Sequence, residues 1–578
     1  MKRRNSILIA LIICLTLVLT ACGGAAGTPT SSTTDRSNTA NQHSNRQNKS
    51  SENSAAASPA ASPAASAMPQ ASPPPNTVAA GAAARPAAEA PAADSSRDAQ
   101  PPAAHPRPTA RPDRSPRPDD EPYDSTFYRN YGVNPFVDTL EDPRSTFAMD
   151  VDTASYGVMR RYLADGYLPD PDSVRVEEYL NSFNYRYPQP EDGSMFAVYT
   201  EAAPSPFGGK GYDMVQIGIQ GRTIQEEDRA PASLTFVIDV SGSMEREERL
   251  ETVKQALALL VEQLRADDQI GIVVYGSDAR SILPPTSGAN KGRILSAIDE
   301  LQPSGSTNVE AGLDIGFAQA EEAFVPDGNN MILLCSDGVA NNGVTDPETL
   351  LQTYRRYTSQ GIKLSTYGFG MGNFNDELME RLADAGNGIY SYIDTLDEAE
   401  RVFVHNLTGT LQLIARDAKI QVEFNPDVVS HYRLIGYENR DVTDQDFRND
   451  SVDAGEVGAG HSVTALYEIR RVPDATGDIA TVRIRYHQPD NSKIIEETQT
   501  LRSEDRRASF GRASGRFKLA VSVAQYAELL RHSRWFQGST LDDVVELAHE
   551  AQRDFERDPD VTEFIRLLET AASLARAE

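Results

Sequence analysis

The stretch Phe236-Val-Ile-Asp239-Val-Ser241-Gly242-Ser243-Met244 decides the fold of the central part of this chain. An apolar run over 233–239 ends at an acidic residue, and a glycine turn then places two serines beside it. Such a run predicts a buried parallel strand, and open α/β sheets hold ligands at the carboxyl ends of their strands. A carboxylate with two hydroxyls suits Mg²⁺. Taken alone, a turn in which Asp and Ser cap a helix is the commoner explanation.

Strand and helix patterns alternate around that stretch. Further strands are predicted at 269–275, 330–335 and 362–367, and helices at 249–264, 291–301, 309–324, 347–359 and 376–385. This alternation predicts a parallel sheet with helices on both faces. We therefore expect a doubly wound, mostly parallel α/β domain over 230–415.

Two later loops add oxygen ligands at the same sheet edge. Thr307 lies in Gly305-Ser-Thr-Asn308, just before a predicted helix. Asp337 follows the buried strand at 330–335. Three loops that carry only oxygen ligands indicate a site for a hard cation.

These residues resemble the von Willebrand factor A domain and its metal-ion-dependent adhesion site. Asp239, Ser241 and Ser243 match its D-x-S-x-S motif, and Thr307 and Asp337 match its distant threonine and aspartate. The resemblance implies that the hydroxyls bind the metal directly and the aspartates bind directly or through water. It also implies an open coordination position, which a Glu or Asp of a protein partner fills. Mg²⁺ is the expected ion, with Mn²⁺ and Ca²⁺ as alternatives.

A wider resemblance covers nearly all of 123–578. The segments 147–156, 368–375 and 432–440 look like a bacterial subfamily in which a lipoprotein carries the A domain between an N-terminal region and a C-terminal partner domain. Phe374 stands where that subfamily has tyrosine. The resemblance implies that a shift of the last A-domain helix, about 395–415, can switch affinity.

The regions on either side of the A domain have other patterns of predicted strands and helices. Residues 123–229 form an α+β region, with strands at 145–152, 196–199 and 214–220 and helices at 153–165, which Asp152 or Thr153 would cap, and 174–183. Residues 416–503 predict a β-sandwich with strands at 418–424, 432–436, 462–469, 480–486 and 493–500. Residues 504–578 are helical, at 517–530, 541–555 and 562–576. We expect the strands on both sides to build one sandwich, with the A domain inserted in a loop.

The first residues predict export. Lys2, Arg3 and Arg4 precede an apolar run over 7–20, too short to span a membrane. Leu19-Thr-Ala-Cys22 resembles the bacterial lipobox, which implies a lipoprotein signal peptide over 1–22 and a lipidated Cys22. Residues 23–122, rich in Pro, Ala and Ser, predict a disordered stalk. The protein would be exported and anchored to the cell membrane, on its extracytoplasmic face, by lipid alone.

Composition argues against some classes of protein. The chain of 578 residues has 55 basic and 84 acidic side chains and a net charge of −29, which argues against nucleic-acid binding. Three cysteines cannot build a disulfide framework, and Cys335 reads as core packing. Asp150 and Asp152 resemble a cation-binding pair, but helix capping is favoured. Residues 245–249 could rim the metal site, but a solvated helix start is favoured. For Trp535, core packing is favoured over a role as a binding anchor.

The function these patterns favour is a binding protein of the adhesion type, not an enzyme. One alternative is a Mg²⁺-dependent phosphatase of the haloacid-dehalogenase type, which needs a second carboxylate where Ser241 stands. Another is a scaffold of an envelope complex with a purely structural metal.

Overall fold

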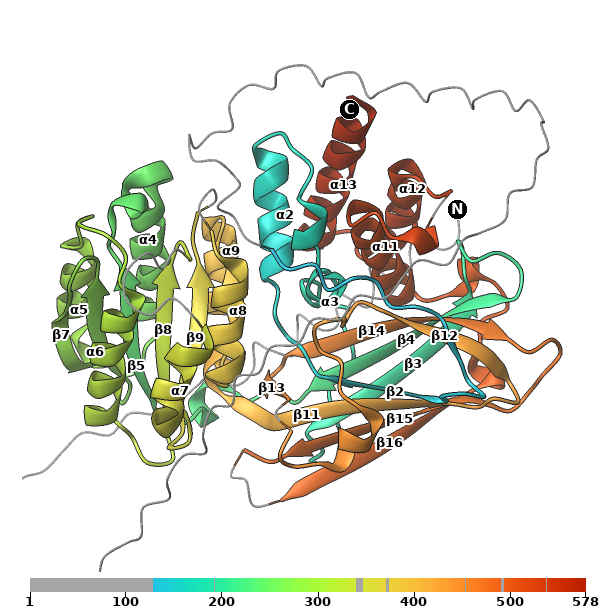
Figure 1. The fold of residues 1–578 in the computed structure, drawn as a ribbon, viewed down its shortest axis with the longest axis horizontal. Helices are drawn as coiled ribbons and strands as arrows, with labels where there is room; N and C mark the ends of the chain where they lie inside the picture. Colours follow the sequence, from blue (N-terminus) through green and yellow to red (C-terminus); the bar gives the residue numbers. More distant parts are fainter. Residues whose placement is uncertain are drawn as a thin grey trace, which may run out of the picture. The chain divides into compact units, whose positions relative to one another are not determined.

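A computed structural model describes residues 128–191, 193–338, 347–370, 374–452, 454–489, 493–536 and 538–577. The predicted signal peptide over 1–22, Cys22 and the stalk over 23–122 lie outside these residues. The described strands form three sheets (Figure 1). No helix in the described ranges combines the length and the apolar character that a membrane span requires.

The A domain contains one six-stranded sheet in the order β10-β9-β8-β5-β6-β7. All neighbouring strands run parallel except β6 and β7. This confirms the predicted doubly wound, mostly parallel sheet. The strands are β5 (Ala232–Asp239), β6 (Gln269–Tyr275), β7 (Ala279–Ser287), β8 (Asn329–Ser336), β9 (Ile362–Gly368) and β10 (Tyr390–Tyr392).

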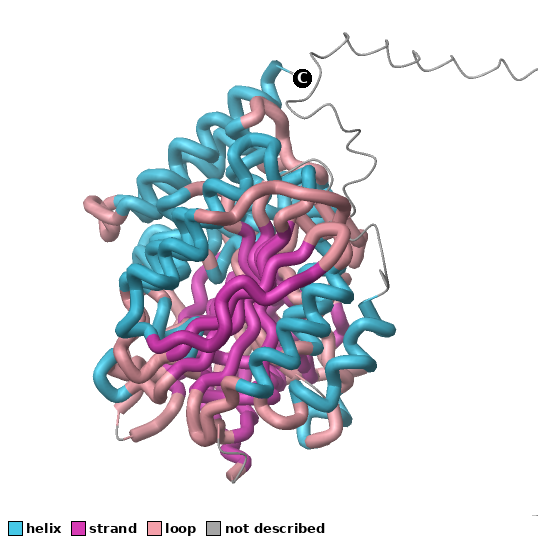
Figure 2. The backbone as a smooth tube through the Cα atoms, turned by 90° about the vertical axis from the view of Figure 1, so that its left-hand side faces the viewer, coloured by secondary structure: helices cyan, strands magenta, loops and turns pink. Residues whose placement is uncertain are grey.

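Helices cover both faces of this sheet because alternate strand residues point to opposite sides. On β5, Phe236 packs into a core with α4 and α5, whereas Val237 packs into a core with α6, α7 and α8. Figure 2 shows the strands enclosed by helices on either side. The helices are α4 (Arg249–Glu262), α5 (Lys291–Asp299), α6 (Val309–Glu322), α7 (Pro347–Thr358) and α8 (Asp376–Ala385).

The predicted last helix of the domain is broken into pieces. It consists of α9 (Leu396–Glu400), a π-helical turn (Arg401–His405) and α10 (Leu407–Leu411). The edge strands β7 and β10 had no clear sequence signal. β7 contains Pro284 and Pro285, which are tolerated because it lies at the sheet edge.

The other two sheets form the sandwich. One has the order β1-β12-β14-β4-β3, and the other has β13-β11-β15-β16, with β2 also paired to β11. Their strands are β1 (Val137–Asp138), β2 (Arg144–Ala148), β3 (Phe196–Pro204), β4 (Tyr212–Gly221), β11 (Leu413–Phe424), β12 (Val429–Ile435), β13 (Gly455–Gly458), β14 (Ser462–Arg471), β15 (Asp478–His487) and β16 (Ile494–Arg502).

Pairing across the A domain confirms the predicted insertion. β4 precedes the A domain and pairs with β14, which follows it, and β2 pairs with β11 in the same way. β11 begins at Leu413, before the predicted boundary at 416, and β2 ends at Ala148, whereas the predicted strand continued to 152.

Helices cover the outer face of the β1-β12-β14-β4-β3 sheet. α11 (Gly515–Leu530), α12 (Leu541–Gln552) and α13 (Pro559–Ala577) share a core with α2 (Ala154–Ala164) and α3 (Val176–Asn181). Met214, Ile435 and Leu466 contribute the sheet side of this core. The C-terminal helices and the helices of the N-terminal region therefore form one layer.

Candidate metal centre

Asp239 ends a strand in the middle of the A-domain sheet. Every residue of β5 is buried, and the Asp239 side chain is 0% exposed. Its Oδ1 accepts a hydrogen bond from the Ser241 amide (2.8 Å), and its Oδ2 accepts one from the Ser336 hydroxyl (2.9 Å). Ser336 ends β8, the parallel neighbour of β5. The carboxylate is thereby held at the carboxyl edge of the sheet.

The two predicted serine ligands lie in the turn after Asp239. Ser241 precedes a 3-10 helix over Gly242–Glu248 (η4), and Ser243 lies within it. Their hydroxyl oxygens are 2.9 Å apart. Ser241 is buried and Ser243 is half-buried, so one hydroxyl oxygen lies deep beside Asp239 and the other lies nearer the surface.

Backbone contacts join the Thr307 loop to this turn and to the residues that follow β6. The Gly242 amide donates to the Gly305 carbonyl (3.0 Å), and the Asn308 amide donates to the Gly276 carbonyl (3.0 Å). Gly305 has a φ of +87°, and a Cβ there would lie 2.6 Å from a neighbouring side-chain oxygen. Glycine is therefore required for the approach. Thr307 is buried directly before α6.

Asp337 follows β8 and is also buried. Its Oδ2 accepts a hydrogen bond from Nη1 of Arg249 at 3.1 Å. We predicted 245–249 to be a solvated helix start, and for Arg249 this is wrong because its side chain is 2% exposed. A buried carboxylate needs a charge partner, and Arg249 supplies one.

Asp239 has a different electrostatic environment. Burial, followed by the negative charge of Asp337, raises the pKa of Asp239 to about 7, while hydrogen bonds from Ser241 and Ser336 lower it. Among the described residues, no basic side chain forms an ion pair with Asp239. A carboxylate buried without a basic partner is stabilised by a proton or by a bound cation.

The side chains at this edge fit a hard divalent cation. In the described part of the chain, no three His, Cys, Asp or Glu side chains gather as metal ligands. A metal here would therefore depend on the hydroxyls of Ser241, Ser243 and Thr307. Mg²⁺, Mn²⁺ and Ca²⁺ accept such oxygen ligands, whereas zinc prefers nitrogen and sulfur.

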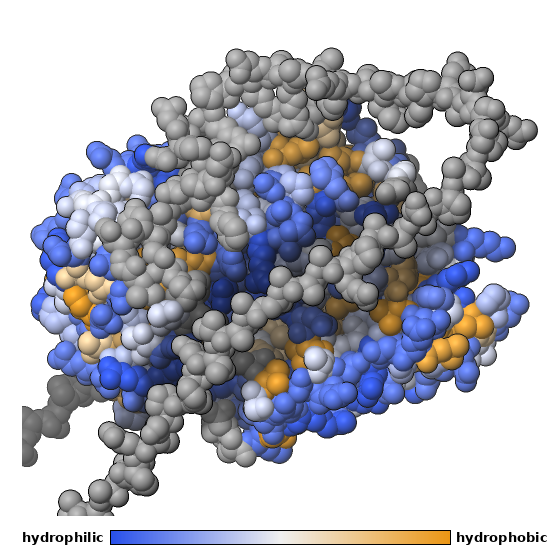
Figure 3. Space-filling model, in the orientation of Figure 1, coloured by the Kyte–Doolittle hydropathy of each residue, from blue (hydrophilic) through white to orange (hydrophobic). Residues whose placement is uncertain are grey.

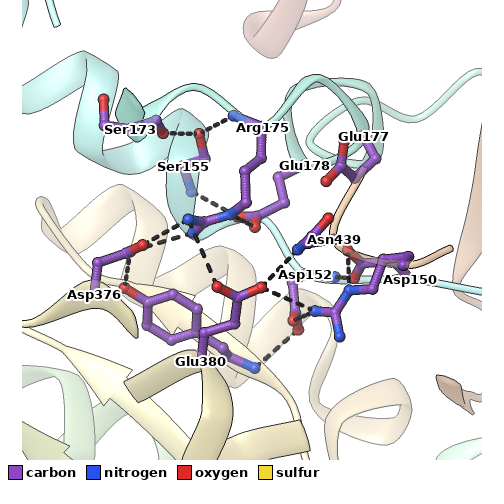
Figure 4. Close-up of polar contacts among 12 residues, drawn as sticks. Asp150, Asp152, Ser155, Ser173, Arg175, Glu177, Glu178, Asp376, Glu380 and Asn439 are labelled. Carbon is purple, nitrogen blue, oxygen red and sulfur yellow. Dashed lines mark hydrogen bonds and ion pairs between the residues drawn. The ribbon is translucent and has the colours of Figure 1, made fainter. Parts of the chain in front are cut away.

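A second group of buried acids lies where α8 meets the N-terminal region and the sandwich (Figure 4). Arg175 donates to both oxygens of Asp376 (2.5 and 3.2 Å) and also pairs with Glu178 and Glu380. We call this group the joint cluster, and its members are Asp150, Asp152, Arg175, Glu177, Glu178, Asp376, Glu380 and Arg440.

Asp150 and Asp152 do not cap α2, contrary to our prediction. Nε of Arg440 donates to Asp150 (3.1 Å), and Nη2 of Arg440 donates to Asp152 (3.0 Å). Asp152 also accepts the amide of Tyr390 on β10 (2.9 Å). Thr153 occupies the cap position without a side-chain hydrogen bond. The two acids join the N-terminal region to the A domain and the sandwich because each finds a partner far away in sequence.

The remaining predictions concern single residues and the surface. Cys335 is buried and free, as expected, and Trp535 is part-buried, with its indole N–H donating to the Asn134 carbonyl (2.9 Å). A cleft of about 850 Å³ lies among the loop after α3, α9 and α13, and none of the five predicted ligands lines it. On the face drawn in Figure 3, hydrophilic residues predominate and hydrophobic ones form small patches.

Known families match three parts of the chain. The von Willebrand factor type A domain matches residues 233–405, and a second family described as von Willebrand factor matches residues 122–215. The C-terminal family of the uncharacterized protein YfbK matches residues 409–477 and 471–574. Type A domains commonly mediate adhesion between proteins and often bind a divalent metal.

Relatives extend the match along the chain. The uncharacterized protein YfbK of Escherichia coli is 37% identical over 478 residues, which cover 77% of this chain and 80% of that protein. Inter-alpha-trypsin inhibitor heavy chain H3 of Bos taurus is 30% identical over 167 residues, 28% of this chain and 18% of that protein. A solved von Willebrand factor type A structure from Catenulispora acidiphila has a TM-score of 0.40 and 14% identity, and the match covers 64% of this chain and 89% of that chain.

The similarity to YfbK spans the A domain and both flanking regions, and the C-terminal match is to the family named after it. The chain therefore belongs to the YfbK family, with a von Willebrand factor type A domain between its two sandwich-forming regions.

Proposed function

We propose that this protein is an exported binding protein, anchored to the cell membrane through Cys22, that captures an acidic residue of a protein partner at the A-domain edge. Asp239, Ser241, Ser243, Thr307 and Asp337 would hold one divalent cation, with Mg²⁺ as the expected ion. The recognised group would be a Glu or Asp side chain.

The observation that carries this proposal is the arrangement around Asp239. This carboxylate is buried and has no basic partner among the described residues, and the hydroxyl oxygens of Ser241 and Ser243 lie beside it. Hydroxyls contribute no negative charge, and Arg249 already offsets the charge of Asp337. A bound divalent cation would therefore keep an excess of positive charge, which attracts a carboxylate from outside.

Calorimetric titration of the full chain with MgCl₂ and MnCl₂ tests the metal centre. We expect wild type to bind and Asp239→Ala to lose binding while both remain folded by circular dichroism. Asp267→Ala is a matched control because Asp267 is an exposed aspartate of the same domain. Absence of binding in wild type would refute the metal centre.

Partner capture is tested separately. Immobilised wild-type protein should retain a protein partner in Mg²⁺ and release it in EDTA, and Asp239→Ala should retain none. If EDTA unfolds the protein instead of releasing a partner, the metal is structural and the scaffold alternative holds. Turnover of a generic phosphomonoester that requires Asp239 would favour the phosphatase alternative.

The anchor has its own test. Metabolic labelling with a fatty acid should mark wild type and not Cys22→Ala, and the variant should leave the membrane fraction. Labelling that persists in the variant would contradict the assignment of Cys22.

A further inference from the structure

Helix α2 belongs to the N-terminal region, yet it packs into two cores. Tyr156, Met159 and Leu163 face the core shared with the C-terminal helices. Ala154 and Val158, four residues apart and thus on one face of the helix, belong to the core of the A domain. α2 is therefore packed between the A domain and the C-terminal helices.

A close backbone contact and a buried ion pair fix α2 against the A domain. A Cβ on Gly157 would lie 2.8 Å from the Tyr392 carbonyl oxygen, so the helix backbone lies directly against β10. Arg160 is 5% exposed and donates to Asp394 (2.5 and 3.0 Å) and to Glu398 (2.7 Å). Buried pairs of this kind are costly to break, so α2 has little freedom to shift.

The turn after Ser243 has an unfavourable backbone conformation. Glu247 (φ 49°, ψ 28°) and Glu248 (φ 57°, ψ 27°) are consecutive left-handed residues that are not glycine. Each such residue costs about 1–2 kcal/mol, so surrounding contacts must hold the turn in place.

Arg161 of α2 provides such a contact. Its Nη2 donates to Glu247 at 2.9 Å, and its Nε donates to Asp165 of its own helix end at 3.1 Å. Arg249 begins α4 directly after the turn and pairs with Asp337. The turn therefore lies between Ser243, a predicted metal ligand, and Arg249, the ion-pair partner of Asp337. Arg161, which lies outside the A domain, contacts Glu247 between them.

We propose that Arg161 is a positioning residue of the metal centre, through which helix α2 sets the metal affinity of the A domain. This inference rests on the proposed function. By this inference the N-terminal region influences the metal centre although none of the five predicted ligands belongs to it.

Calorimetric titration of the full chain with MgCl₂ tests the inference, comparing wild type with Arg161→Gln. Loss of a positive charge near a cation site would by itself tighten Mg²⁺ binding. Loss of a positioning contact would instead weaken Mg²⁺ binding, and we expect the affinity to fall about two- to fivefold. Arg448→Gln is a matched control because it breaks a surface ion pair with Glu496, in the sandwich, and should leave affinity unchanged.

Charge reversal of the pair sharpens the test. The double variant Arg161→Glu/Glu247→Arg should restore affinity toward that of wild type. Unchanged or tighter binding by Arg161→Gln would overturn the inference.

If wild type binds no Mg²⁺, the proposed function fails, and hydrogen exchange without metal decides the positioning role. Faster exchange of amides 244–250 in Arg161→Gln would support it, and unchanged exchange would overturn it.

Discussion

Two groups of buried acids among the described residues, the joint cluster and the candidate metal centre, are neutralised differently. In the joint cluster, the guanidinium groups of Arg175 and Arg440 donate to acids of the N-terminal region and of the A domain. At the candidate metal centre, Arg249 pairs with Asp337, and Asp239 is accompanied by hydroxyls. A carboxylate that accepts hydrogen bonds from a guanidinium has a charge partner within the protein, whereas one beside hydroxyls can accept a cation. The group that compensates a buried acid thus distinguishes the structural joint from the proposed binding site.

Of the substitutions considered, removal of Arg175 from the joint cluster should lower the stability of the fold most. Arg175→Met leaves the buried Glu178 and Asp376 without their shared partner, and we expect unfolding free energy to fall by about 3–5 kcal/mol. Urea unfolding measures it. Arg448→Met, at an exposed pair, should change stability by less than about 1 kcal/mol. A similar small change in Arg175→Met would remove the distinction between the two sites.

Rising pH should also weaken the joint cluster. Burial raises the pKa of Glu177 to about 7 and that of Glu178 to about 8; nearby acids add to this, and Arg175 opposes it at Glu178. The folded protein favours the protonated forms, so their stabilising contribution is complete below 4.5 and is lost as pH rises through 7 to 8.

We expect the unfolding free energy to fall on the order of 4 kcal/mol between about pH 6 and about pH 9. Urea unfolding across that range measures the change, and Glu178→Gln should flatten the curve. A variant that retains the wild-type slope would show that the joint cluster does not carry the titration.

At the metal centre, a smaller effect is expected from one hydroxyl. Thr307→Val keeps the shape and removes the oxygen, so Mg²⁺ affinity should fall about tenfold, or ~1.4 kcal/mol, with stability unchanged. Calorimetry measures the affinity. Thr353→Val, at an exposed threonine of α7, is the control. Equal affinities would place Thr307 outside the ligand set.

The smallest expected effect concerns backbone strain near the metal centre. Glu248→Gly removes the left-handed penalty and should raise the unfolding free energy by about 0.5–1 kcal/mol. Glu251→Gly, in the following helix, should lower it by about 1 kcal/mol. Thermal unfolding compares the two variants, and destabilisation by both would show that the turn is not strained.

The sequence predicted the A domain well because its buried strands are continuous apolar runs that end at polar residues. The same pattern placed Asp239 and Asp337 at one edge. It did not predict that Arg249 is buried or that Asp150 pairs with Arg440, since an ion pair between distant residues leaves no local periodicity. Strand β7 was missed because its prolines are acceptable only at an edge, and edges are properties of the whole sheet.

The insertion of the A domain also determines how the molecule bears a load. The domain leaves the sandwich at the end of β4 and returns at the start of β11. β4 is hydrogen-bonded to β3 and β14, and β11 to β2, β13 and β15. A pull on a captured partner would therefore be shared between two strands embedded in different sheets. A domain attached at two points is held more firmly than one on a single linker, so a force on a partner bound at the proposed metal centre would pass directly into the sandwich.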